Sequence, residues 1–362
     1  MRLKRNSHLF LEWSADGLAL ISPVDARTMV RAGQGIVRLL STLDDWTLRS
    51  DVSAFLFDQG IIPERAEELL HILIRNQVLV QEGHEGTRIE GPWDAWGSIS
   101  MLYHQHSRNA RYVTDAEAKD ELVMEVTAVP APDIVKSYSD LKRIYLPRHH
   151  RRIDAYYYDV LLNRRSYRSF TAQPLELQDF ACLLHIVFGP QRFVDAGSFG
   201  TLQLKTTPNA GARHEIECYV IAFNVLGIPP GLYHYDSLAQ ALEALPVNIC
   251  REQISDIMYD QPMAETAPMI CLTTAVTERS AYKYKHGRAY RLLFYNVGHL
   301  GQTFALTATA LGMGTFQTAA FRDSVADDLL GIDGSSEFVT YVLGCGKVGE
   351  ASSTLPLADF IT

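Results

Sequence analysis

The chain has 362 residues, 47% hydrophobic and 10% aromatic, so it can bury a packed core and does not resemble a disordered protein. Its length suggests two domains, or one large domain with an appendage. The formal net charge of -9 argues against a general nucleic-acid-binding protein, which needs a basic face to release phosphate counterions.

The five cysteines are odd in number and include no Cys-x-x-Cys pair, a pattern that favours buried free thiols in a reducing compartment. Because no cluster of cysteine and histidine has the spacing of zinc ligands, we expect no metal site. Glu12 and Asp16 interrupt the basic N-terminus, which therefore does not resemble a signal peptide. No apolar run approaches the roughly 18 residues that span a bilayer. We expect a cytoplasmic protein without membrane or nucleic-acid partners.

Residues 1–90 predict a small domain of short helices and strands. Apolar runs at 9–11 and 18–21 predict two strands, with Asp16-Gly17 as the turn between them. Three helices follow, whose signals are an apolar face at 36–43, Thr47 as an N-cap and Pro63 as a first helical residue. A short apolar run at 78–80 predicts a closing strand or wing. Three short helices with such a wing are typical of a winged-helix-like domain.

Residues 91–152 predict a linker and a connecting segment. Gly91, Pro92 and Gly97 interrupt any regular pattern, and residues 114–140 are expected to be loosely structured and partly acidic. A basic run follows, made up of Lys142, Arg143, Arg148, His149, His150, Arg151 and Arg152. Such a run is either a solvated loop or an electropositive rim near an anionic ligand.

From residue 153 to 362 helices and strands alternate, which predicts a domain of the α+β class. Apolar periodicity predicts helices at about 155–163 and 175–187, and a long one from Tyr290 to Leu311 that ends at Gly312. β-branched and aromatic runs predict four strands, at 217–224, 232–235, 269–274 and 338–343. The second of these strands is expected to be hairpin-like.

Arg164-Arg165-Ser166-Tyr167-Arg168 places three guanidinium groups within five residues, just after a predicted helix. Their mutual repulsion costs stability unless an anion lies among them. Arginine suits a phosphate because its donors come in pairs, and Ser166 adds a hydroxyl donor. The run therefore indicates either an anion site or a solvated face.

Three further segments carry small residues where a flat ligand or a close neighbour needs space. In the segment from Thr207 to His214, small side chains let the backbone approach a ligand, and Asn209 can offer a donor and an acceptor to a heterocycle edge. The alternative there is an ordinary loop before a strand. Gly298 and Gly301 lie inside a predicted helix, where each glycine lowers helix stability by about 1 kcal/mol relative to alanine. Glycine at these positions therefore indicates tight packing against a neighbour. The last segment, 311–321, is a glycine-capped helix end with a small-residue turn.

In this order and spacing the four segments resemble the nitroreductase superfamily and, within it, the SagB-type peptide dehydrogenases, also called azoline dehydrogenases. The segment Gly231–Asp236 and the Arg288-x-Tyr290-Arg291 element match the same subgroup, and the resemblance covers about 155–348. His104 and Ser107-Arg108 also resemble the segment just upstream of the core in that subgroup. The N-terminal unit is similar in pattern to the small winged-helix peptide-binding modules of ribosomal-peptide pathways.

The resemblance implies a nitroreductase-like FMN-binding fold, with a central mixed or antiparallel sheet flanked by helices, and a homodimer with FMN in a cleft at its interface. It further implies that the ribityl phosphate and one ring edge are held by Arg164, Arg165, Ser166 and Arg168, with Lys347 near the phosphate.

The same resemblance implies that Pro208, Asn209, Ala210 and Gly211 line the isoalloxazine ring, with Asn209 in place of the usual serine. Gln302 matches the family's glutamine, with Thr303 where asparagine is common, and Ala319 and Ala320 would present backbone groups to the ring.

Azoline dehydrogenases carry a Lys-Tyr pair shortly before the Arg-x-Tyr-Arg element. Making a thiazole or an oxazole from its azoline removes a hydride and a proton from adjacent carbons, so the reaction needs FMN as hydride acceptor and a nearby base. Lys283-Tyr284 is the natural match but lies one residue too far from Arg288, whereas Lys285-His286 lies one residue too close and lacks the tyrosine. The candidate catalytic residues are therefore Lys283, Tyr284 and Lys285, and the alternative is a solvated lysine-rich loop.

These features predict an FMN-dependent dehydrogenase that oxidises peptide-borne thiazoline or oxazoline rings in natural-product biosynthesis, with dioxygen reoxidising the flavin. Expected partners are a peptide substrate or leader peptide and a cyclodehydratase. A second hypothesis keeps the flavin but changes the substrate to a carrier-bound or free small molecule, as in reductases of quinones or nitro compounds. A third makes the protein a peptide-binding scaffold.

Overall fold

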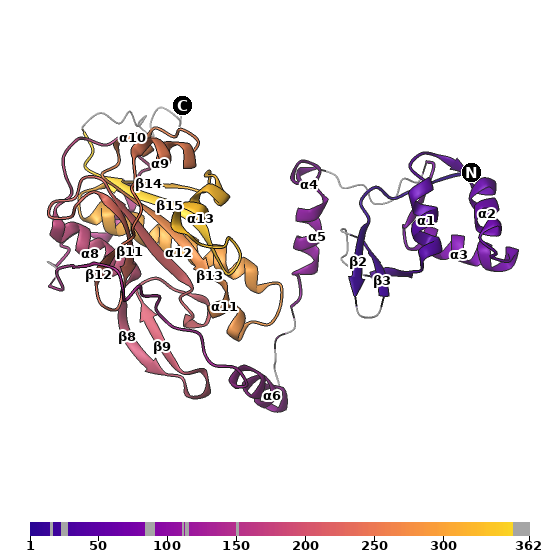
Figure 1. The fold of residues 1–362 in the computed structure, drawn as a ribbon, viewed down its shortest axis with the longest axis horizontal. Coiled ribbons are helices and arrows are strands. Elements are labelled where there is room, and N and C mark those ends of the chain that lie inside the picture. Colours follow the sequence, from indigo (N-terminus) through magenta and orange to yellow (C-terminus); the bar gives the residue numbers. More distant parts are fainter. Residues whose placement is uncertain are drawn as a thin grey trace. The chain divides into compact units, whose positions relative to one another are not determined.

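The computed structural model describes residues 1–14, 17–22, 28–83, 91–110, 112, 116–149 and 152–349 (Figure 1). It divides the chain into two compact units, residues 1–111 and 112–362. The segment expected to link two domains, 91–152, is therefore divided between the units instead of standing apart. The predicted turn residue Asp16 and the basic residues His150 and Arg151 lie outside the described residues.

The first unit contains the three predicted helices, α1 (Gln34–Thr42), α2 (Arg49–Asp58) and α3 (Pro63–Arg75). Their apolar faces share one core with buried strand residues such as Leu3 and Leu79. Pro63 opens α3 as predicted, because a first helical residue needs no backbone N–H. The prediction that Thr47 caps α2 is wrong: its hydroxyl donates to the Asp45 carbonyl, and Thr47 pairs with Leu3 in a sheet.

Two small antiparallel sheets complete the first unit. One joins β1 (Arg2–Arg5) to β5 (Thr47–Leu48) and β6 (Leu79–Gln81); the other has the order β2 (Phe10–Ser14), β3 (Gly17–Ile21), β4 (Thr28–Ala32). Strands β2, β3 and β6 lie where the sequence predicts them. Strand β1 has no alternating apolar pattern, because Leu3 is its only apolar residue, so sequence periodicity does not reveal it.

Helices occupy much of the segment expected to be irregular. They are α4 (Pro92–Trp96), α5 (Ser98–His106) and α6 (Ala116–Thr127). The His104 ring on α5 packs against Trp93 with 4.8 Å between ring centres, and the Ser107 hydroxyl donates to the Tyr103 carbonyl. The expectation of a loosely structured segment over 114–140 is therefore wrong for α6.

The second unit is built on a seven-stranded sheet of order β14-β15-β13-β10-β11-β12-β7, in which all neighbouring strands are antiparallel. Its strands are β7 (Arg143–Tyr145), β10 (Ile216–Ala222), β11 (Gly231–Asp236), β12 (Ala241–Ala244), β13 (Met269–Val276), β14 (Gly314–Thr318) and β15 (Glu337–Gly346). The four predicted strands are β10, β11, β13 and β15, and β10 and β11 pair as a hairpin. This confirms the α+β class, with an antiparallel central sheet.

Helices cover both faces of this sheet, so alternate residues of one strand enter different cores. Cys218 and Val220 of β10 pack with the long helix α12 (Ala289–Ala310) and with α8 (Leu177–Phe188). Tyr219 and Ile221 pack on the other face, with α9 (Arg251–Ile257) and α13 (Asp323–Leu330). Because both faces of β10 are buried, the strand is largely apolar and does not alternate with polar residues.

Shorter elements surround the ends of the sheet. They are α7 (Tyr157–Asn163), η1 (Gly197–Phe199), η2 (Ala210–Ala212), α10 (Met263–Thr266) and α11 (Thr277–Lys283). A separate hairpin of β8 (Pro190–Asp195) and β9 (Thr201–Lys205) projects from the second unit, with η1 at its tip (Figure 1). Helix α6 packs against that tip.

Candidate functional site

The loop from Thr207 to His214, which we expected to line a flavin ring, is held by a hydrogen bond to the long helix α12. The Ala210 N–H in η2 donates to Asn296 Oδ1 at 3.1 Å, and the Asn296 amide donates to the fully buried Glu215 at 2.7 Å. Sequence patterns alone do not reveal Asn296, because it lies 86 residues beyond Ala210. The one available signal is an asparagine on the apolar face of α12.

The side chain of Asn209 belongs to the same hydrogen-bond network. Its Nδ2 donates to Glu215 at 3.0 Å, and its Oδ1 accepts the His214 N–H at 2.9 Å. His214 has a φ of 46°, a left-handed conformation that costs about 1–2 kcal/mol outside glycine, so this bond helps to hold a strained turn. Both groups that we expected at a heterocycle edge are thus bonded within the loop, and the Asn209 side chain shapes the loop.

The structure brings Lys283 and Tyr284 against this loop. Gly211 has a φ of 62°, and a Cβ atom there would lie 2.7 Å from the Tyr284 hydroxyl and 3.1 Å from Lys283 Nζ. The position therefore needs glycine both for its backbone conformation and for space. Lys283, the last residue of α11, is half-buried, whereas Lys285 is exposed. Of the two candidate pairs, Lys283-Tyr284 is the one that contacts the Gly211 turn.

The surroundings of Lys283 suit a proton acceptor. Burial, and then the charge of Arg213, lower the pKa of Lys283 below its usual range. Burial, and then Tyr112, raise the pKa of Tyr284, so its phenol keeps its proton. Lys283 Nζ also lies 5.5 Å from the centre of the Phe199 ring at the hairpin tip. A lysine with a lowered pKa can take a proton, and the protonated tyrosine beside it can donate a hydrogen bond.

The arginine run lies beside the edge strand β14. Ser166 forms a bridge with Thr315, and further along the Thr171 N–H donates to the Lys347 carbonyl at 2.8 Å. The run Arg164–Arg168 and Lys347 are therefore at the same end of the sheet. Arg165, Ser166 and Arg168 are exposed, and Arg164 is half-buried. Cationic and hydroxyl donors gathered in this way suit a phosphate group.

The two groups of expected flavin residues lie at opposite ends of the sheet. The antiparallel register places Glu337, the first residue of β15, beside Val276, and Gly346, the last, beside Gly314. The arginine run and Lys347 adjoin the Gly346 end, whereas the Gly211 turn and α11 adjoin the Glu337 end. A strand of ten residues such as β15 spans about 30 Å. This distance far exceeds the length of an FMN molecule, so one chain alone does not gather both groups around it.

The two glycines of the long helix differ in their surroundings. A Cβ atom at Gly301 would lie 3.0 Å from the side chains of Gln317 and Tyr341, so this glycine packs tightly, as expected. Among the described residues, Gly298 has no such neighbour within 4 Å, so their side chains leave the space above it open. Gln302, next to Gly301, is exposed.

Ala319 and Ala320 follow β14 and are exposed. The Ala320 N–H donates to Thr318 Oγ1 at 3.0 Å, and its carbonyl accepts from Gln261 at 2.6 Å. Both backbone groups of Ala320 that we expected to face a ring are thus bonded within the chain. Its small side chain still keeps this turn open to a flat ligand.

A buried network of charges lies within the sheet itself. His234 Nδ1 is 2.9 Å from Glu243, and its Nε2 is 3.2 Å from Glu217. Burial alone would lower the pKa of His234, but its bonds to the two carboxylates raise it, so the ring carries both protons. Burial opposes ionisation of Glu217 as well, yet His234 and Arg279 lower its pKa to about 2. The Gly231–Asp236 segment therefore supplies a structural histidine, which the resemblance did not indicate.

Residues 133–138 of the connecting segment form hydrogen bonds with this network. Lys136 Nζ donates to the Tyr219 hydroxyl at 2.7 Å, and the Tyr138 N–H donates to Glu243 at 2.9 Å. Arg143, from the basic run, pairs with Glu243 at 2.7 Å. The expectation of a loose segment is therefore wrong here too, and Arg143 belongs neither to a solvated loop nor to an electropositive rim.

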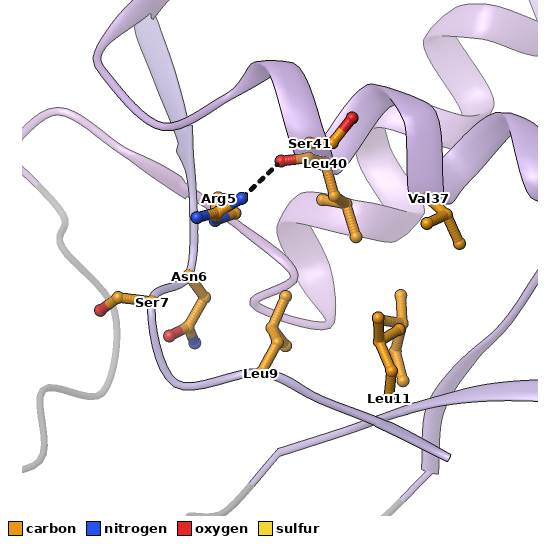
Figure 2. A pocket seen from close by; sticks show the side chains of 9 residues that line it. Arg5, Asn6, Ser7, Leu9, Leu11, Val37, Leu40 and Ser41 are labelled. Atoms are coloured by element: carbon orange, nitrogen blue, oxygen red, sulfur yellow. Dashed lines mark hydrogen bonds between the residues drawn. The ribbon is translucent and has the colours of Figure 1, made fainter. Parts of the chain in front are cut away.

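The first unit has a pocket between α1 and the strands β2 and β3, with a volume of about 260 Å³ (Figure 2). Arg5 lies at its edge, donates to the Leu40 carbonyl at 3.1 Å and pairs with Asp44 at 2.5 Å. Apolar side chains make up much of the lining, namely Leu9, Leu11, Leu20, Val37 and Leu40, with Asn6, Ser7 and Ser41 as polar neighbours. An apolar lining with a few polar groups can accept an apolar side chain of a peptide.

No disulfide joins any of the five cysteines, all of which lie among the described residues; four of them are buried, and Cys250 is exposed. Among the described residues, no group of three or more histidine, cysteine or acidic side chains is placed to hold a metal ion. In the part of the chain that the structure describes, no helix has the length and apolar character needed to cross a membrane.

The second unit is similar in sequence to known proteins. A family model described as the nitroreductase family matches residues 161–347. A nitroreductase candidate from Methanocaldococcus jannaschii is 32% identical over 174 residues, which cover 48% of this chain and 83% of that protein. The trifolitoxin-processing protein TfxB of Rhizobium leguminosarum bv. trifolii is 27% identical over 163 residues. That match covers 44% of each chain, so it spans less than half of TfxB.

A solved structure shares the fold of the second unit. It is a nitroreductase candidate from Anabaena variabilis, with a TM-score of 0.51 and 22% identity. The match covers 67% of this chain and 49% of that one.

Proposed function

The chain belongs to the nitroreductase family, and we propose that it is an FMN-dependent dehydrogenase that oxidises peptide-borne thiazoline or oxazoline rings to thiazole or oxazole. The observation that carries this proposal is the contact of Lys283 and Tyr284 with Gly211, which places a candidate base beside a loop suited to a flat ring. The similarity to a trifolitoxin-processing protein supports a peptide substrate in natural-product biosynthesis.

The residues present fit FMN in both of its parts. The exposed donors Arg165, Ser166 and Arg168, together with Arg164 and Lys347, suit its phosphate. The missing side chain at Gly211 lets Tyr284 and Lys283 pack against the turn, which places them beside the loop proposed to line the ring. We propose that Pro208, Asn209, Ala210, Gly211, Gln302, Ala319 and Ala320 line the isoalloxazine.

The chain's own residues would handle the proton. Oxidising an azoline breaks two C–H bonds on adjacent carbons and forms a C=C bond between them, releasing one hydride and one proton. The chemistry that FMN would supply when bound is acceptance of the hydride, with dioxygen as the final acceptor of the two electrons. Neutral Lys283 takes the proton at Nζ, and the protonated Tyr284 donates a hydrogen bond to the substrate or to the lysine. Lys285, which is exposed, has no part in this proposal.

We propose that two copies of the chain share each FMN. The arginine run and Gly211 adjoin opposite ends of β15, so a second copy must supply one of these groups to complete a site. The exposed aromatic residues beside the long helix provide a surface for that copy. They are Tyr156, Tyr157, Tyr158, Phe294 and Tyr295, with the open Gly298 among them. Exposed aromatic groups of this size mark interaction surfaces in soluble domains.

Mixing two inactive variants tests this arrangement. One chain carries Lys283→Met; the other carries Arg165→Ala and Arg168→Ala. In a mixed dimer one site receives intact Lys283 from one copy and intact arginines from the other, so it should work. A 1:1 mixture after subunit exchange should recover about a quarter of the wild-type activity. If Lys283 and the arginines served the same site from one copy, every site would carry a lesion and mixing would restore nothing.

We also propose that the first unit binds a leader peptide in the pocket of Figure 2, and that a cyclodehydratase, which would make the azoline, is a partner. The apolar lining around Leu9, Leu20 and Val37 would take an aliphatic side chain of that peptide.

The proposed activity is tested by incubating the purified protein with an azoline-containing peptide and measuring the mass of the product. We expect a yellow protein that contains FMN, and a loss of about 2 Da per ring, the mass of two hydrogens. A protein that takes up no FMN, or an FMN-loaded protein that leaves the peptide mass unchanged but is reduced by NADPH, would contradict the proposal. The second of these outcomes would favour a reductase of small molecules.

A further inference from the structure

We propose that Arg279 is a positioning residue, which holds Lys283 and Tyr284 against the Gly211 turn by joining helix α11 to the carbonyl of His214. This inference rests on the proposed function, because it concerns the placement of the proposed base. Arg279 lies one helical turn away from Lys283 on the same helix.

Arg279 is buried and fully engaged. Only 4% of its surface is exposed, and its guanidinium pairs with Glu217 at 2.6 Å. Its Nη1 also donates to the His214 carbonyl at 3.1 Å, and its Nε donates to the Asp133 carbonyl at 2.7 Å. Three acceptors from two separate segments, 214–217 and Asp133, thus fix one side chain. Arginine suits this role because its planar group donates in several directions at once, whereas a lysine amine is a single point.

Together with contacts within the loop and helix α11, these bonds link Arg279, the loop and Lys283 in a closed ring of contacts. His214, held by Arg279, donates its N–H to Asn209 at 2.9 Å, and Asn209 leads directly into the turn at Gly211. Gly211 contacts Lys283, and α11 returns from Lys283 to Arg279. Arg279 thus provides a direct hydrogen bond between the helix and the loop at this point.

The Asp133 carbonyl adds the connecting segment to the same ring of contacts. The neighbouring Ile134 carbonyl accepts from Gln203 at 2.6 Å, so two adjacent carbonyls of this segment are held. The placement of Lys283 therefore depends on residues upstream of the sheet as well as on the loop.

Replacing Arg279 with methionine and, separately, with lysine tests the proposal in the full-length protein. The control is Ser280→Ala, the next residue on the helix, which is buried and whose hydroxyl has no hydrogen-bond partner among the residues that the structure describes. One readout is the acetylation rate of Lys283 relative to that of exposed Lys285, resolved by fragmentation mass spectrometry, with each rate corrected through its pH dependence for the fraction of neutral amine. In the wild type Lys283 should react at least about tenfold more slowly, because it is protected by packing.

With Arg279→Met we expect the acetylation rate of Lys283 to approach that of Lys285, while FMN content stays at the wild-type level. The kcat for azoline oxidation should fall by at least about tenfold with KM within about twofold, because a displaced base affects chemistry more than binding. Arg279→Lys should recover part of the loss, and Ser280→Ala should behave as the wild type.

Unchanged protection of Lys283 and unchanged kcat in Arg279→Lys and Arg279→Met would overturn the proposal. So would a KM that rises in place of a falling kcat. If Arg279→Met does not fold, the same readouts on Arg279→Lys decide. If no variant and no wild-type protein oxidises an azoline, the proposed function fails, while the acetylation rates still test the role of Arg279.

Discussion

Replacing Lys283 with methionine should lower kcat for azoline oxidation by about 10²- to 10⁴-fold, the range that a positioned acid or base contributes. The reason is that Lys283 is the proposed proton acceptor and lies against the turn at Gly211. FMN content and KM should change little, because the proposed phosphate donors lie at the other end of the sheet. Steady-state kinetics on an azoline peptide, with flavin absorbance for cofactor content, provide the measurement.

The matched control is Lys285→Met, which removes an exposed lysine two residues away and should leave kcat unchanged. The pH dependence gives a second check. Lys283 accepts a proton only when neutral, so kcat should rise with pH through the pKa of Lys283, which burial and Arg213 place below the usual lysine range. Equal kcat in Lys283→Met and wild type, or a larger loss in Lys285→Met, would rule out the proposed base.

Replacing His234 with leucine should destabilise the second unit by about 3–5 kcal/mol, the usual effect of removing one partner of a buried ion pair. His234 is fully buried between Glu217 and Glu243, and its loss leaves two carboxylates facing each other without the cation between them. Denaturant unfolding, followed by a signal from the second unit, measures the change. The control is His149→Gln, which replaces an exposed histidine. It should change the free energy of unfolding by less than about 0.5 kcal/mol.

The effect of His234→Leu should also depend on pH. The folded state raises the pKa of His234, so its contribution is complete below the unfolded pKa of about 6.5 and is lost as pH rises through the folded pKa. The difference between wild type and His234→Leu should therefore shrink at alkaline pH. Glu217 behaves in the opposite sense: its pKa of about 2 means that its contribution is lost as pH falls towards that value. A difference that grows steadily with pH would contradict a protonated His234.

Apolar periodicity predicts the long elements well, because each carries enough residues to show its period. The 22 residues of α12 present their apolar face at helical spacing, and β13 and β15 are long enough to stand out. Short strands such as β1 and β7 do not, since they have too few buried residues, and pairing with distant strands decides their conformation.

The candidate site shows a similar division. The arginine run and the glycine-containing loop are contiguous in sequence, so their composition is visible there. Asn296 and Arg279 act through bonds that span many residues, and none of the four sequence segments singled out above includes them. The spacing of lysines before Arg288 left two candidate pairs, and only the position of Gly211 beside Lys283 and Tyr284 distinguishes them.

The separation of the expected flavin residues could not be predicted from their order in the chain. It follows from the antiparallel register, which places Gly346 and Glu337 at opposite ends of β15. Sequence order alone does not determine which strand ends meet, because neighbouring strands in this sheet come from distant parts of the chain.

Anaerobic mixing of the protein with an azoline peptide tests most directly whether this protein oxidises an azoline through its own flavin. The FMN-loaded protein is mixed with an azoline peptide in the absence of dioxygen, and flavin absorbance is followed together with the peptide mass. We predict that the flavin bleaches in a single turnover and that each bleached flavin corresponds to one ring lighter by about 2 Da. Flavin that stays oxidised with the azoline peptide, yet bleaches with NADPH, would contradict the claim.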